Sequence, residues 1–104
     1  MSARFPLYET LRVGAGDRRV SKSRKVRIAQ KLTALPLNSR ELVYLIIREH
    51  AAQKGREESL PYGGRQTSEG VYFPVTQIPK SLWPLLHYYV ELDRKAQFDQ
   101  REEL

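Results

Sequence analysis

One apolar stretch of the chain has the spacing of a helix, a second is a continuous apolar run between helix boundary signals, and a third fits a short strand followed by a helix. In the first, residues 25–35, apolar residues recur at intervals of three or four, which predicts one helix face: Ile28, Leu32 and Leu35. Ser21 or Ser23 fits the N-cap of this helix, where a hydroxyl accepts a hydrogen bond from a free backbone N–H. Pro36 ends it, because the residue before a proline avoids the α region.

The second stretch, residues 37–55, predicts a buried helix. Residues 42–47 form a continuous apolar run, which alone would fit a buried strand as well as a helix. Asn38 and Glu41 have the spacing of a capping box, in which the cap accepts from the backbone and the acid reaches back. Gly55 then follows as a C-terminal stop. These two boundary signals favour a helix over a strand.

The third stretch, residues 70–92, begins with β-branched and aromatic residues that suit a pleated, half-buried surface: Val71, Tyr72, Phe73 and Val75. Pro74 has no N–H for a β-ladder, so the strand should be short or lie at a sheet edge. Ser81 fits an N-cap, and Pro84 falls in the first helical turn, where its missing N–H is not needed. An apolar stripe follows at helical spacing: Leu82, Leu85, Leu86, Tyr89 and Leu92.

The pattern predicts a mostly α domain over residues 21–95, a three-helix bundle with a short β-strand or hairpin inserted before the last helix. Residues 1–20 have no clear period and are expected to form a flexible or loosely docked arm. Residues 54–69 read as a long loop, and residues 96–104 as a frayed tail. The predicted core is Leu32, Leu35, Leu42, Leu45, Ile46, Val71, Phe73, Leu82, Leu86 and Tyr89.

Composition limits the class of protein. The chain has 104 residues and no cysteine, so it holds no disulfide framework and no cysteine-based metal site. No apolar run is long enough to cross a bilayer, and the first residues lack the apolar core of a secretory signal. We therefore expect an intracellular protein with no membrane contact. The formal net charge of +6 favours anionic partners.

Much of that charge is concentrated in one stretch without any acid, residues 18–31. Three interpretations stay open: contact with nucleic-acid phosphates, a nuclear import signal, or a solvated helix face. No interleaved aromatic residue indicates base stacking. The candidate nucleic-acid-binding residues are Arg18, Arg19, Lys22, Arg24, Lys25 and Arg27.

The sequence offers no catalytic or metal site. His50 and His87 are the only histidines, and no cluster of ligands surrounds either in the sequence. Residues 61–64, Pro-Tyr-Gly-Gly, lack the Lys-Ser/Thr pair of a phosphate-binding loop and read as a turn. Trp83 and Tyr88 fit a core better than a binding cage. We therefore expect a non-catalytic protein without a cofactor.

The second and third stretches together resemble a known family. Residues 31–50, KLTALPLNSRELVYLIIREH, look like the first half of the extra-terminal (ET) domain of bromodomain-containing transcription regulators, which also ends some YEATS-domain proteins. Residues 70–92, GVYFPVTQIPKSLWPLLHYYVEL, look like its second half. The matching places are held by Leu35-Pro36, Ile78, Leu86 and Tyr89-Val90.

This resemblance implies a nuclear, chromatin-associated adaptor that captures a partner peptide as an added strand, with apolar side chains entering a groove between helices. The implied peptide-binding residues are Val71, Tyr72, Phe73, Val75, Ile46 and Leu86. Alternation should turn Val71, Phe73 and Val75 to the core and leave Tyr72 beside the ligand. In the family, the strand alternates acidic and apolar residues, and the acidic ones bind lysines of the partner. Because these acidic residues are absent here, we expect the ligand to be selected mainly by its apolar side chains. Alternatively, residues 5–13 occupy the strand edge in cis.

Overall fold

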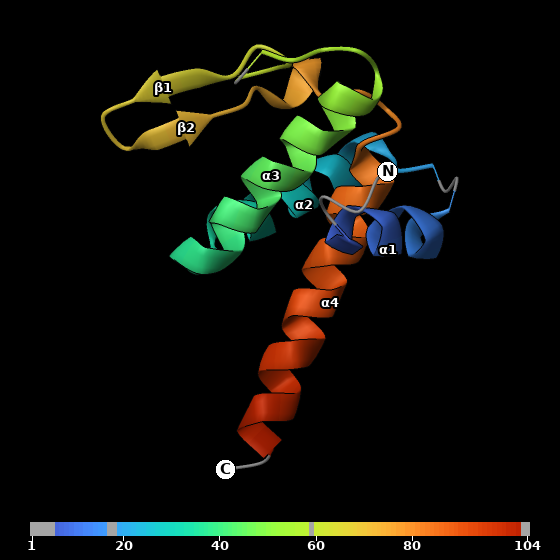
Figure 1. Ribbon diagram of the computed structural model, residues 1–104. Coiled ribbons are helices and arrows are strands. Elements are labelled where there is room, and N and C mark those ends of the chain that lie inside the picture. The colour runs from blue at the N-terminus through green and yellow to red at the C-terminus, as the bar shows by residue number, and fades with distance from the viewer. Residues whose placement is uncertain (1–5, 17–18, 59, 103–104) are drawn as a thin grey trace.

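The computed structural model describes residues 6–16, 19–58 and 60–102. Over these residues the chain forms four α-helices, one β-hairpin and one 3-10 turn (Figure 1). In chain order the elements are α1 (Pro6–Ala15), α2 (Lys22–Thr33), α3 (Leu37–Gln53), β1 (Arg65–Thr67), β2 (Gly70–Tyr72), η1 (Val75–Gln77) and α4 (Trp83–Glu102). The mostly α class with a hairpin before the last helix is confirmed, with one helix more than expected.

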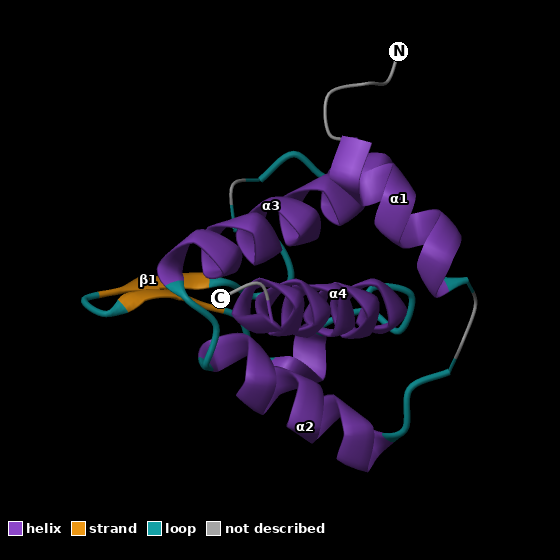
Figure 2. Cartoon of the chain, turned by 90° about the horizontal axis from the view of Figure 1, so that it is seen from below, coloured by secondary structure: helices purple, strands orange, loops and turns teal. Residues whose placement is uncertain are grey.

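The start of α4 is the centre of the domain. Figure 2 looks nearly along this helix and shows α1, α2 and α3 arranged around it. Its first turns are apolar on most sides, with His87 and Glu91 as the polar exceptions, as expected of a helix that several neighbours cover. The buried residues there, starting just before the helix, are Leu82, Trp83, Pro84, Leu85, Leu86, Tyr89 and Val90. The C-terminal half of α4 runs on beyond the other helices to Glu102, where a frayed tail was expected from residue 96 (Figure 1).

Residues 6–15 form helix α1, within the stretch of residues 1–20 that was expected to be a flexible or loosely docked arm; residues 1–5 and 17–18 lie outside the described residues. Tyr8, Leu11 and Ala15 are buried at spacings of three and four, so they form one face, which packs against α4. Gly14 lies inside α1, although glycine is unfavourable within a helix, and the Tyr88 ring packs against it, 2.5 Å from the place of a Cβ. Since α1 lies on α4, its residues do not occupy the edge of β2.

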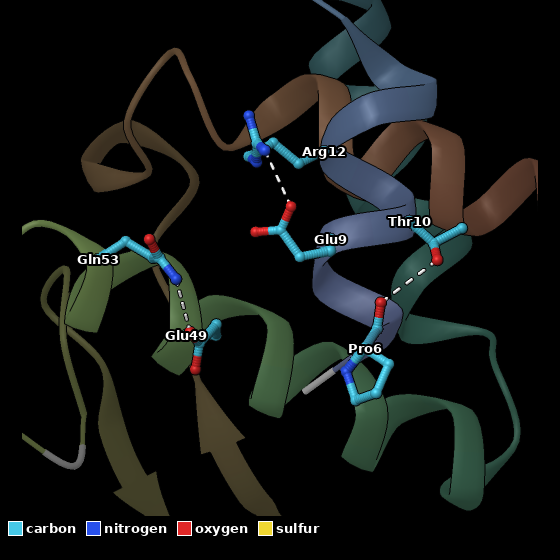
Figure 3. A network of polar contacts seen from close by, with 6 residues as sticks. All are labelled: Pro6, Glu9, Thr10, Arg12, Glu49 and Gln53. Atoms are coloured by element: carbon cyan, nitrogen blue, oxygen red, sulfur yellow. Dashed lines mark hydrogen bonds and ion pairs between the residues drawn. The ribbon is translucent and has the colours of Figure 1, made fainter. Parts of the chain in front are cut away.

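The exposed side of α1 is polar apart from Val13, and the polar contacts drawn on it are local (Figure 3). Arg12 Nη2 lies 2.9 Å from Glu9 Oε1, and Thr10 Oγ1 donates to the Pro6 carbonyl. The pair drawn on α3 is also local, with Gln53 donating to Glu49. Apolar burial therefore contributes most of the docking of α1.

The ends of α2 and α3 follow the sequence in part. Ser21 caps α2 as predicted, its Oγ accepting from the Arg24 N–H. The capping box is wrong, because α3 already begins at Leu37 and has no side-chain cap. Gly55 ends α3 as predicted: its φ is +82°, and the N–H groups of Gly55 and Arg56 donate to the carbonyls of Ala52 and Ala51.

The expected strand is shorter than predicted and has a partner. β2 ends at Tyr72, and the chain then turns into η1. β1 forms within the expected loop of residues 54–69 and pairs antiparallel with β2, Gln66 opposite Val71. Thr67 Oγ1 closes the turn between them, donating to the Gly70 carbonyl at 2.8 Å and accepting from the Glu69 N–H. The backbone N–H and C=O groups on one edge of β2 are therefore already paired with β1.

Half of the predicted core is buried: Leu35, Ile46, Leu82, Leu86 and Tyr89. Leu32 and Phe73 are partly buried against it. Leu42, Leu45 and Val71 were wrongly placed there, with exposed fractions of 36%, 43% and 42%. The reason for the two leucines is helical geometry, because the inward face of α3 carries a different stripe: Val43, Ile46, Ile47, His50 and Ala51.

Substitution of Leu86 tests the central position of α4. Leu86→Ala leaves a cavity among helices on all sides, so we expect the free energy of unfolding to fall by about 2–5 kcal/mol. The matched control is Leu45→Ala, which removes the same atoms from a half-exposed site and should cost less than about 1 kcal/mol. Urea denaturation followed by circular dichroism measures both. Equal losses would contradict the arrangement around α4.

Candidate nucleic-acid interface

The basic stretch folds into a helix with one cationic face. Arg24, Arg27 and Lys31 are exposed on α2 at spacings of three and four, so they lie on the same side of the helix. Ile28, between them in sequence, is turned inward and buried. Lys22 is exposed at the start of α2, Arg19 is exposed before it, and Arg18 lies outside the described residues. α2 contains no acidic residue, so nothing on the helix itself neutralises this face.

A pocket of about 460 Å³ adjoins the start of α2. Three cationic side chains line it from three separate segments: Arg19 from the loop before α2, Lys25 from α2, and Lys80 from the turn before α4. The other lining residues are Gly16, Val20, Ser81 and Pro84, so none of the described lining residues is acidic. Like charges around a concavity focus a positive potential into it.

Lys25 lines the pocket and also contacts a core residue, Trp83. Its Nζ lies 5.9 Å from the ring centroid of Trp83, within reach of a cation–π contact. Trp83 is only 1% exposed, as expected of a core residue, and its Nε1 has no hydrogen-bond partner among the described residues. It is also the single tryptophan of the chain, so its fluorescence can report on the neighbouring pocket residue.

A smaller cavity of about 70 Å³ lies between α2 and α4, and its lining includes an acidic residue as well as cationic ones. Arg19 and Arg24 border it, as do His87 and Glu91. Glu91 Oε2 lies 3.5 Å from His87 Nε2, one turn earlier in α4. The carboxylate lines the smaller cavity and not the larger one, so the two differ in charge.

His50 forms a buried polar network next to the pocket. Its Nδ1 lies 2.8 Å from Tyr62 Oη, and its Nε2 lies 2.9 Å from Ser81 Oγ. Loss of hydration on burial, with a smaller effect of the Lys54 charge, lowers the pKa of His50 from 6.5 to about 4. The histidine is therefore neutral at pH 7. Ser81 was expected to be the N-cap of α4. Its Oγ instead lies beside His50 Nε2, and α4 begins two residues later, at Trp83.

Tyr62 reaches His50 from a strained backbone. The turn at residues 61–64 was predicted, and Gly64 N–H donates to the Pro61 carbonyl across it. Tyr62 has a φ of +56°, a conformation that costs a non-glycine residue about 1 kcal/mol or more. Its buried ring packs edge-on to His50, which holds it there.

The contacts Ser81–His50 and His50–Tyr62 resemble those of a serine nucleophile next to a histidine base. The spacing of these residues in the sequence does not reveal this arrangement. A pKa near 4 makes the imidazole a weak proton acceptor at neutral pH, whereas general bases are most effective near the working pH. The network ties α3 to the turn at residues 61–64 and to the start of α4, and that is its evident physical role.

The residues expected to bind a peptide do not share one surface. Val71 and Tyr72 are exposed on β2, and Val75 is exposed on η1 rather than facing the core. Phe73 is partly buried, its ring centroid 6.3 Å from that of Tyr44. Ile46 and Leu86 are completely buried between helices, so a ligand could reach these two only if the helices separated.

Comparisons with known proteins leave the resemblance at the level of architecture. No family model, no curated protein and no solved structure matches the chain. Within the described residues, no three side chains of the metal-binding types lie close enough to share an ion, and no helix has the length and apolar character needed to cross a bilayer.

The low pKa of His50 predicts a pH-dependent stability. Between pH 6.5 and about 4 the unfolded chain binds a proton that the folded histidine does not. The stabilisation is therefore complete above pH 6.5 and is lost as the pH falls toward 4, with a slope of up to about 1.4 kcal/mol per pH unit. Urea denaturation from pH 7 to pH 4 measures it.

The control for this experiment is His50→Gln, which keeps a polar group at the site but does not titrate. The two proteins differ only at residue 50, so the difference between the two stability curves isolates His50. If the curves run parallel from pH 7 to pH 4, His50 is not held neutral by the fold.

Proposed function

We propose that the protein binds nucleic acid through a basic surface, defined as Arg19, Lys22, Arg24, Lys25, Arg27, Lys31 and Lys80. The single observation that carries this proposal is the exposed cationic face of α2, with no acid on the helix and with a cation-lined pocket at its start. Phosphate contacts release condensed counterions, which favours binding without any sequence-specific contact.

The shape of the surface favours the sugar–phosphate backbone as its ligand. Arg24 and Lys31 are seven residues apart on α2, a distance of about 10 Å along the helix axis. Long, exposed cations at this spacing can follow a phosphate chain. Because α2 carries no aromatic residue, stacking on bases is not expected to contribute from this helix.

The salt dependence of oligonucleotide binding tests the proposal. The logarithm of the binding constant should fall linearly with the logarithm of salt concentration for a duplex and a single strand. In the variant Arg24→Gln/Arg27→Gln, the slope should decrease by about 0.7–0.9 for each phosphate that the protein no longer neutralises. Fluorescence anisotropy with a labelled oligonucleotide measures both quantities.

The matched control, Arg40→Gln/Arg48→Gln, removes two arginines from α3, which Figure 2 shows across α4 from α2. It lowers the net charge equally and should retain most of the slope. If the two variants bind equally weakly, net charge rather than the α2 face drives binding. If the wild-type protein does not bind the oligonucleotide even at low salt, the proposal is wrong.

The second candidate is the ET-like adaptor, which captures a partner peptide in a nuclear transcription or chromatin complex. Its support is the hairpin, which stands clear of the helices in Figure 1 with Val71 and Tyr72 exposed by 42% and 52%. β1 covers one edge of β2, so an added strand would pair along the other. Such binding would depend on apolar side chains and only mildly on salt, opposite to the behaviour expected of the basic surface.

A further inference from the structure

We infer that the pocket lined by Arg19, Lys25 and Lys80 receives a terminal phosphate of the nucleic-acid strand, a monoester at a strand end, while α2 contacts the phosphodiesters that follow. This inference rests on the proposed function and goes further, because it names the chemical group that enters the pocket and the direction in which the strand leaves it.

Positive charge converges on the pocket. The three cations come from three segments that only the folded chain brings together, and no described residue that lines the pocket offsets them. Their mutual repulsion opposes folding unless an anion lies between them. Lys25 is also positioned by the Trp83 ring below it, so at least one of the three is held at the pocket rather than free in solvent.

A terminal phosphate matches the pocket in charge and shape. A phosphate monoester carries about −1.5 to −2 charges near pH 7, more than the single charge of a diester inside a strand. A diester has a sugar on both sides and needs a groove that is open at both ends, whereas a strand end can enter a concave pocket. The volume of about 460 Å³ falls in the range of about 300–1,000 Å³ that is usual for small-molecule sites.

A neutral hydrogen-bond donor lies at the wall of the pocket. Ser81 lines the pocket, and its Oγ lies 2.9 Å from His50 Nε2. A hydroxyl has one proton to donate and accepts through its lone pairs. When Tyr62 donates to Nδ1, His50 Nε2–H donates to Ser81, and the Ser81 proton is left for an anion in the pocket. His50 is thus a positioning residue, and Ser81 a contact residue.

The test compares three labelled single strands of one sequence, with a 5′-phosphate, a 3′-phosphate or no terminal phosphate. We expect one of the two phosphorylated strands to bind roughly tenfold more tightly than the unphosphorylated strand, because charge-assisted hydrogen bonds are the stronger kind. The variant Arg19→Gln/Lys80→Gln should lose this preference and bind all three strands with the same, reduced affinity, because both residues also belong to the basic surface.

Two controls keep the result interpretable. Arg27→Gln lies on α2 outside the pocket and should weaken binding to all three strands while preserving the preference for the phosphorylated one. Both exchanged pocket residues are exposed, and their removal relieves repulsion among the three cations, so the urea midpoint of the double variant should be no lower than that of the wild type. A single Arg19→Gln exchange provides a milder form of the same test.

Trp83 provides a second readout without any oligonucleotide. Because Lys25 lies over its ring, inorganic phosphate should change the tryptophan fluorescence of the wild type in a saturable way, and not that of the double variant. Ser81→Ala should weaken this response, as should His50→Gln.

The possible results separate the two proposals. Equal affinity for all three strands, or a preference that survives in the double variant, would overturn the terminal-phosphate site and leave nucleic-acid binding in place. Failure of every strand to bind at low salt would overturn both. A preference that disappears only in the pocket variants supports the inference.

Discussion

Burial of the start of α4 is the constraint on which the rest of the structure depends. Leu82, Trp83, Leu85, Leu86, Tyr89 and Val90 form one broad buried face of the helix there, and buried Pro84 and half-buried Tyr88 extend it over most of the circumference. Each such side chain gains about 1.5–3 kcal/mol when fully buried. No single neighbour could cover all sides, so α1, α2 and α3 each pack against this helix. The pocket lies at the same place, where Gly16, Arg19 and Val20 line it together with Lys80, Ser81 and Pro84 at the start of α4.

The polar network of His50 completes this arrangement at the same end of α4. It holds Ser81, directly before the helix, at a fixed distance from α3, and it offsets the unfavourable backbone of Tyr62. A neutral, fully bonded histidine costs little to bury, whereas a charged one would be expensive. The same network gives Ser81 a defined orientation at the wall of the pocket, so stability and the candidate site depend on one set of bonds.

The sequence predicted those features that depend on local rules. The faces of α2 and α4, the cap at Ser21 and the stop at Gly55 all follow from spacing and backbone conformation. The inward face of α3 could not be chosen, because a continuous apolar run has no period to separate Leu45 from Ile46. α1 was missed because Gly14 is unfavourable in an isolated helix, and only the Tyr88 ring makes a glycine necessary there.

The hairpin and the pocket show the same limit. β1, Arg65–Thr67, is short and polar, so nothing apolar marked it as a strand. The sequence identified Arg19 and Lys25 as candidate binding residues, but Lys80 joins them only through the fold. The pairing of Ser81 with His50 likewise depends on tertiary packing. Long-range juxtaposition of polar residues leaves no local pattern, which is why the candidate site was only partly predictable.

Amide-shift mapping by NMR with a terminally phosphorylated single strand tests nucleic-acid binding by the basic surface most directly. We expect the largest shifts along residues 19–31 and at Lys80 and Ser81, with the hairpin unaffected. Shifts centred on Gly70–Tyr72 and Val75, with α2 unchanged, would contradict binding through this surface.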